Sequence, residues 1–374
     1  MTQRGVEFHP RRGFILMSAG LISLMLGGLA GIFTMWTWAG WWRGPLLGVD
    51  RHWALMVFGF FGALIGNELL NVLSIEWKGR AAPNTVLIPA ALLLWGAVLS
   101  TLAEFTAQAL ILAGAYVALL TYYSAKTYLT PSSTGLRPFV YNYLIIAALA
   151  ATLVYIVFSP SLYIKAAALM FPVGTIFAVM TRDISLVTGR RPSRGYEGAA
   201  AFLLVTAGLF AWSLNAAQVG GLLIFLAAAL SAATSGILRG AGRGKALSVA
   251  EILTAYMWLG LGGLLLLLTG GSGIWYDVAL HAVALGFIFN IVFGVDVILL
   301  DALMSQIRKK VVVRPRRAFP VVGLASYVLL NIGLAARALY AHTGQPLLAT
   351  ISGPVVGLAV VTFLINMQLK ILRQ

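Results

Sequence analysis

Residues 275–303 read WYDVALHAVALGFIFNIVFGVDVILLDAL, an apolar run with a single histidine, His281, near its start. About 20 consecutive apolar residues suffice for a helix to cross a bilayer, so this stretch predicts a membrane-spanning helix. An imidazole ring in hydrocarbon is costly unless it is hydrogen-bonded, paired with a charge or bound to a metal. His281 is therefore expected to have a defined partner.

The composition is that of a polytopic membrane protein. Of the 374 residues, 60% are hydrophobic and only 10% are charged, whereas a soluble domain carries about 25% charged residues. The chain has no cysteine, which excludes disulfides, thiolate-bound zinc, iron–sulfur clusters and thiol catalysis. A metal would have to be bound by histidine, methionine, carboxylate or carbonyl groups.

Division of the apolar runs at clusters of charge, proline and glycine predicts an all-α integral membrane protein with twelve transmembrane helices. No linker is long enough to separate domains, so residues 1–374 are expected to form a single polytopic transmembrane domain. The predicted spans are residues 13–39, 52–75, 84–103, 105–125, 139–158, 161–181, 197–214, 218–238, 247–269, 276–303, 318–341 and 347–369.

The basic residues support this topology, because lysine and arginine gather in cytoplasmic loops. With the N-terminus inside, 22 of the 26 basic residues fall on the cytoplasmic side, and the others are Arg43, Arg51, Lys165 and Arg337. The net charge of +15 then reflects topology, and no nucleic-acid partner is expected. We expect a multi-pass protein of the cell membrane, with both termini cytoplasmic and basic loops against membrane lipid.

A second histidine, His52, opens the apolar run of residues 52–75. The second and tenth spans run in the same direction across the membrane, so His52 and His281 lie at similar depth near the outer surface. If the two helices are neighbours, the imidazoles can face each other across a flat macrocycle. Two neutral imidazoles without another strong ligand are typical of six-coordinate haem, and both histidines are candidate haem-iron ligands. The alternative is that each makes an ordinary interhelical hydrogen bond.

Two further features belong to this hypothesis. Arg337, about one turn inside the outer end of its helix, is a candidate partner for a haem propionate, or else extends to the outer headgroups. Glu68 and Asp296 lie 16 and 15 residues after His52 and His281, respectively. On neighbouring helices these carboxylates would form a candidate proton or ion site, and satisfied interhelical hydrogen bonds are the alternative.

Residues 278–283, VALHAV, resemble the Val-His-x-His-x-Val segment of haem–copper oxidase subunit I. In that family the first histidine ligates the active-site haem and the second ligates the low-spin haem. His281 matches the second histidine, Ala279 stands at the first, and His52 resembles the other low-spin ligand. The resemblance implies a subunit I-like bundle of twelve helices with a bis-histidine haem b.

Four other segments are similar to the NnrS family, which comprises twelve-helix haem proteins linked to nitric-oxide stress. They are FHPRRGFILMSAG at residues 8–20, HWALMVFGF at 52–60, AVMTR at 178–182 and TGRRP at 188–192. The oxidases place a copper ligand in a His-Pro-Glu-Val-Tyr sequence on the sixth helix, but residues 171–174 read FPVG, and the seventh and eighth spans lack histidine. A copper site of the oxidase pattern is not expected.

Three functions agree with the sequence. The leading one is a b-type haem membrane protein in nitric-oxide response or haem-based redox chemistry. Two imidazoles saturate the iron, so binding of nitric oxide requires one ligand to leave. The second is a membrane electron-transfer protein or quinol oxidoreductase, and the third is a proton- or ion-coupled transporter in which the histidines are structural. Whether the protein is an enzyme is left open by the sequence, which favours a non-enzymatic role; an enzymatic role would be that of an oxidoreductase acting on nitric oxide or quinol.

Overall fold

The computed structural model describes residues 10–43, 49–158, 168–188, 196–238, 246–295 and 321–372, and every regular element in these ranges is a helix. The predicted all-α fold is confirmed. The chain divides into two compact units that interleave along the sequence, with boundaries inside two of the helices. Within the described residues, unit 1 comprises residues 10–30, 49–158 and 168–178, and unit 2 comprises residues 31–43, 179–188, 196–238, 246–295 and 321–372.

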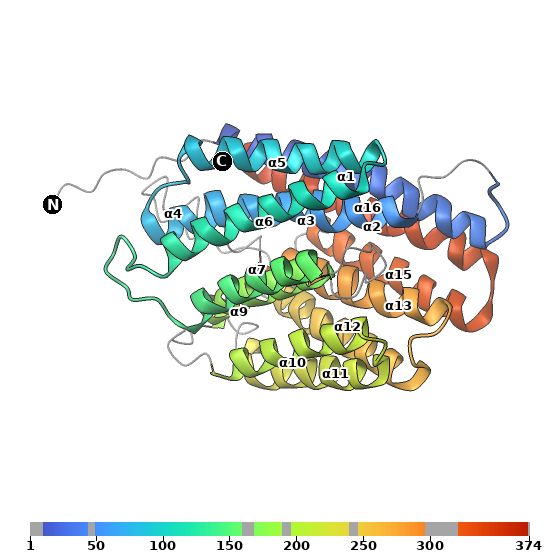
Figure 1. Cartoon of the computed structure of the whole chain (residues 1–374). Helices are drawn as coiled ribbons and strands as arrows, with labels where there is room; N and C mark the ends of the chain where they lie inside the picture. The colour runs from blue at the N-terminus through green and yellow to red at the C-terminus, as the bar shows by residue number, and fades with distance from the viewer. Residues whose placement is uncertain are drawn as a thin grey trace. The chain divides into compact units, whose positions relative to one another are not determined.

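Unit 1 contains the first half of α1 (Pro10–Trp38) and a helical run over residues 49–78 that is interrupted by two π-helical segments. The helices of this run pack against the hairpin formed by α5 and α6 (Figure 1). The elements are α2 (Val49–Ala54), η1 (Leu55–Phe60), α3 (Phe61–Asn67), η2 (Glu68–Val72), α4 (Leu73–Lys78), α5 (Asn84–Leu102), α6 (Thr106–Tyr128), α7 (Val140–Phe158), η3 (Met170–Gly174) and the start of α9 (Thr175–Thr188).

Unit 2 contains the end of α1, the rest of α9 and the later helices of the chain. The consecutive helices α10, α11 and α12 lie side by side, and α15 packs against both α16 and α13 (Figure 1). The elements are α10 (Tyr196–Ser213), α11 (Ala217–Thr234), α12 (Ala246–Thr269), α13 (Ile274–His281), η5 (Ala282–Phe287), α15 (Val321–Thr343) and α16 (Pro346–Leu372).

Membrane-length apolar helices occur at eleven of the twelve predicted spans within the described residues. The sixth prediction, residues 161–181, corresponds to a shorter apolar helix, Met170–Thr181, and its first part lies outside the described residues. The division between the third and fourth spans is confirmed, because the helices end at Leu102 and begin at Thr106 and Glu104 adopts a φ of 66°. A multi-pass membrane protein is established, whereas the count of twelve and the orientation stay predictions.

Two tyrosines of α6 donate hydrogen bonds to the interrupted helix of unit 1, one to α3 and one to the π-helical segment η2. A wide turn leaves a carbonyl without its usual partner four residues later, and such a carbonyl cannot remain unpaired in hydrocarbon. The Tyr116 hydroxyl donates to the Gly62 carbonyl at 2.7 Å, and the Tyr128 hydroxyl donates to the Leu69 carbonyl. Both tyrosine side chains are fully buried. These bonds tie α6 to the interrupted helix that carries His52.

Glycines allow α11 and α12 of unit 2 to cross in direct backbone contact. A Cβ atom built on Gly221 would lie 2.4 Å from the Gly263 carbonyl oxygen, and one on Gly263 would lie 2.6 Å from the Gly221 carbonyl oxygen. Small residues at a helix crossing are the usual means of close packing in membranes, where apolar burial gives no net driving force between helices. The crossing therefore depends on the absence of both side chains.

Replacement of Gly263 by alanine is expected to destabilise the protein by about 1–3 kcal/mol, the usual cost of inserting a methyl group into a filled core. The measurement is unfolding in mixed detergent–SDS micelles. Gly260→Ala on the same helix is the matched control, because its Cβ would meet nothing closer than 3.5 Å. Equal stability of the two variants would contradict the close crossing.

The predicted orientation can be tested with single cysteines, because the chain has none of its own. Ser272→Cys, in the turn before α13, is expected to react with a membrane-impermeant maleimide on intact cells. Ser133→Cys, after α6, is expected to react only after permeabilisation. Both positions are exposed in the structure. Reversed reactivity of the two cysteines would show that the chain has the opposite orientation in the membrane.

Candidate functional site

His52 lies in α2 of unit 1 and is half-buried. Its Nδ1 lies 2.6 Å from the carbonyl oxygen of Gly27 on α1. A Cβ on Gly27 would lie 3.1 Å from the Leu55 Cβ, so the glycine allows α1 to approach the helix that carries the histidine. Because a carbonyl can only accept, Nδ1 carries a proton, and in the neutral ring Nε2 then carries the lone pair.

His281 lies at the end of α13 in unit 2, and its side chain is 12% exposed. Its Nδ1 lies 2.8 Å from the carbonyl oxygen of Asp277, one helical turn earlier, and 3.2 Å from Oδ1 of the same residue. Both acceptors require the proton on Nδ1. In its neutral form, each candidate ligand therefore has the same tautomer within its own unit, with the lone pair on Nε2.

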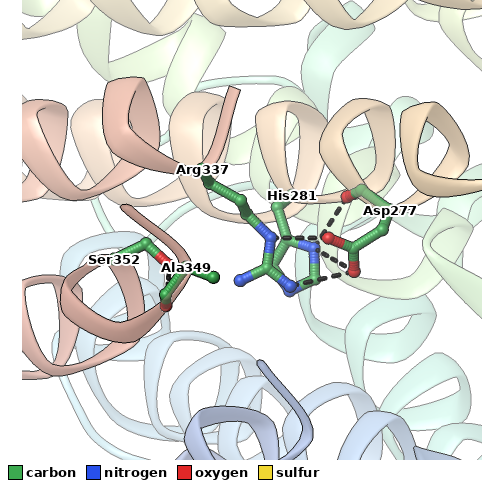
Figure 2. Close-up of polar contacts among 5 residues, drawn as sticks. All are labelled: Asp277, His281, Arg337, Ala349 and Ser352. Carbon is green, nitrogen blue, oxygen red and sulfur yellow. Dashed lines mark hydrogen bonds and ion pairs between the residues drawn. The ribbon is translucent and has the colours of Figure 1, made fainter. Parts of the chain in front are cut away.

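The carboxylate of Asp277 forms a bidentate ion pair with Arg337 of α15. The Arg337 Nε donates to Oδ2 at 2.6 Å and Nη2 donates to Oδ1 at 2.9 Å. Figure 2 shows the carboxylate facing both the guanidinium group and the imidazole of His281. Paired parallel bonds of this kind are strong and geometrically specific, so the three side chains form one connected cluster, the Asp277–His281–Arg337 triad.

The triad includes one residue that the sequence argument did not single out, Asp277. Its spacing of four residues from His281 places both on one helix face, and this signal could have found it. Arg337 was predicted to bind a haem propionate, and the structure gives its Nε and Nη2 an acidic partner from the chain itself. Nη1 takes no part in that ion pair, so the propionate role stays a prediction.

Along α15, from Arg337 towards the start of the helix, amide and hydroxyl side chains join α15 to α12 and to the helix that continues from η5. The Asn331 Oδ1 accepts from Trp258 Nε1 at 2.6 Å, and its Nδ2 donates to Asn290 Oδ1 at 3.1 Å. The hydroxyls of Thr254 and Tyr327 are 2.8 Å apart. This polar seam (Thr254, Trp258, Asn290, Tyr327 and Asn331) fixes the register of α15 and thereby the position of Arg337.

The predicted pair of carboxylates is only partly described. Glu68 begins η2 in unit 1 and is half-buried, whereas Asp296 lies outside the described residues. Beside Glu68, the Asn71 Nδ2 donates to Asn67 Oδ1 at 2.9 Å. A proton or ion site at Glu68 and Asp296 therefore stays a prediction.

Within the described residues, no three His, Asp or Glu side chains come together as a metal-binding cluster. Residues 171–174, the FPVG sequence, lie in η3 of unit 1 and are fully buried. The candidate donors for a metal or cofactor are the two imidazoles, one in each unit. Their chemistry fits haem iron, because each ring presents Nε2 as a neutral donor and holds Nδ1–H in a hydrogen bond.

Comparison with known proteins gives one family. A model described as a domain of unknown function, DUF8744, matches residues 12–371. The match includes His52, Asp277, His281 and Arg337. No curated protein matches the chain. Since the family description assigns no activity, the resemblance to NnrS and to the oxidases stays a prediction.

The Asp277–Arg337 and Glu104–Arg51 ion pairs differ in burial and are expected to differ in energetic effect. Arg337→Ala leaves the half-buried Asp277 carboxylate unpaired and is expected to cost roughly 3 kcal/mol of stability in SDS unfolding. Glu104→Ala, which removes the 67% exposed partner of Arg51, is the control and is expected to change stability by less than about 1 kcal/mol. A smaller loss of stability in Arg337→Ala than in Glu104→Ala would be inconsistent with the structure.

Proposed function

Since the chain belongs to the DUF8744 family, whose description names no activity, we propose from its side chains that it is a b-type haem-binding protein of the cell membrane. His52 and His281 are the iron ligands. The observation that carries the proposal is the hydrogen bond from each Nδ1 to a backbone carbonyl, at 2.6 and 2.8 Å. Histidines that bind metals almost always hold their second ring nitrogen in such a bond, which orients the ring and makes the ligating nitrogen more basic.

The backbone around the two histidines supports the proposal. The π-helical segment η1 begins three residues after His52, and η5 begins directly after His281. Segments of this kind occur often at functional sites, because the extra residue changes the direction of the side chains that follow. Interhelical packing alone does not require two membrane histidines to have the same tautomer, nor to lie next to π-helical segments.

Apolar side chains near His52 can keep water away from a cofactor. Trp53, Phe58 and Phe171 form a chain of ring contacts in unit 1, with centroids 6.0 Å apart in both pairs. All three are buried. In unit 2, Phe287 and Phe289 are buried just after His281. A dry environment of this kind is one of the factors that set the reduction potential of a haem.

When bound, the haem supplies one-electron redox chemistry at its iron. The chain's own contribution is to orient two imidazoles, to hold their Nδ1 protons and to exclude water. Saturation of the iron by two imidazoles favours haem-based electron transfer. The resemblance to NnrS favours a role in the nitric-oxide response, for which one of the two histidines would have to release the iron. No described contact favours transport at Glu68 and Asp296, because Asp296 lies outside the described residues.

The test is a reduced-minus-oxidised visible spectrum with a pyridine haemochrome assay on purified protein. The wild type is expected to show the sharp reduced bands of a low-spin haem b. Both His52→Ala and His281→Ala are expected to lose these bands or to convert to a high-spin spectrum, because one axial ligand is missing. The control is His342→Ala, which changes an exposed histidine at the end of α15 and is expected to leave the spectrum unchanged.

A colourless wild type, after haem supplementation during expression, would overturn the proposal. If only one of the two histidine variants loses the low-spin bands, only that histidine ligates the iron, and the proposed pair of ligands is wrong. Exposure of the reduced wild type to nitric oxide then separates the two roles: a new nitrosyl spectrum indicates gas binding, and an unchanged spectrum indicates electron transfer.

A further inference from the structure

The Nδ1 of His281 lies close to two different oxygen atoms of Asp277. The backbone carbonyl oxygen lies 2.8 Å away and the carboxylate Oδ1 lies 3.2 Å away. The carbonyl acceptor belongs to the helix backbone and persists whatever side chain stands at position 277. The carboxylate is a separate contribution, since it places a negative charge beside the Nδ1 proton.

The position of this carboxylate is fixed. Arg337 binds both of its oxygens, at 2.6 and 2.9 Å, and the side chains of the ion pair are 12% and 16% exposed. At such limited exposure the effective dielectric constant is well below that of water, so a nearby charge acts strongly. The hydrogen bonds of Asn331 to Trp258 and Asn290 hold α15, and with it Arg337, in place.

We infer that Asp277 is a positioning residue for the haem ligand His281, and that the Asp277–Arg337 ion pair sets the reduction potential of the iron. This inference rests on the proposed haem function. A carboxylate that accepts from Nδ1–H shifts negative charge onto the ring, makes Nε2 a stronger donor and favours ferric over ferrous iron. Arg337 limits the effect, because its positive charge offsets the carboxylate.

The charges give opposite signs for the two single variants. Asp277→Asn removes the carboxylate and leaves the Arg337 cation uncompensated, and both changes favour ferrous iron. Arg337→Gln leaves the carboxylate uncompensated and favours ferric iron. The double variant Asp277→Asn/Arg337→Gln has the same net charge as the wild type and replaces the ion pair by two amides that can still bond to each other. It keeps the site testable if a single variant fails to fold.

The experiment is a potentiometric titration of each haem-loaded variant, followed at the reduced visible bands. Asp277→Asn is expected to shift the ferric–ferrous equilibrium about tenfold towards ferrous iron, which is about 59 mV for a one-electron couple. Arg337→Gln is expected to shift it in the opposite direction, and the double variant is expected to lie between the two single variants. The ferric g-values in electron paramagnetic resonance are expected to change in Asp277→Asn, because they depend on the donor strength of the axial imidazole.

The matched control is Glu104→Gln, which removes one carboxylate from the exposed ion pair with Arg51 and is expected to leave the potential unchanged. If the haem-loaded triad variants keep the wild-type potential and g-values and lose only stability, the ion pair merely fastens α13 to α15. That result overturns the inference and leaves the haem function intact. A wild type without haem overturns both proposals, so the two failures are distinguishable.

Discussion

The structure depends on one constraint: at membrane depth, every polar group needs a partner within the protein. In unit 1, tyrosines of α6 donate to the carbonyl of Gly62 in α3 and to that of Leu69 in the π-helical segment η2. In unit 2, the amides of Asn290 and Asn331 satisfy each other across two helices. The histidines follow the same rule through Nδ1. Polar pairing thus fixes the rotation of helices whose apolar faces alone would not distinguish one orientation from another.

Pairing of Nδ1 does more than satisfy a buried group, because it decides which nitrogen keeps the lone pair. In its neutral form, a histidine that donates from Nδ1 to a carbonyl keeps its lone pair on Nε2. Both His52 and His281 have this arrangement, each within a separate unit and each from a different backbone context. The neighbour on α1 supplies the acceptor for His52, whereas the preceding turn of the same helix supplies it for His281.

Much of the fold could be predicted because it depends on length and charge. Apolar runs located eleven membrane-length helices, and charge at Glu104 marked the short break between α5 and α6. The candidate site was predictable only in part. His281 was conspicuous within hydrocarbon, but Asp277 lies at the start of its span, where acidic residues are ordinary. Its partner Arg337 is 60 residues away in sequence, and no local pattern shows a tertiary contact. The π turns escaped prediction because they depend on contacts from another helix, such as the Tyr128 hydroxyl that donates to the Leu69 carbonyl.

The Asp277–Arg337 ion pair is not the arrangement that stability alone would favour. Moving two charges into a half-buried site carries a desolvation cost, and apolar side chains of similar volume often hold two helices together at least as well. A hydrophobic pair would, however, leave no field at the imidazole. The carboxylate contacts the ring, since Oδ1 lies 3.2 Å from Nδ1, and the guanidinium binds that carboxylate through Nε and Nη2. The pair is therefore neutral as a whole but polar at the ring, and a fixed dipole at the ligand is what it adds to the helix contact.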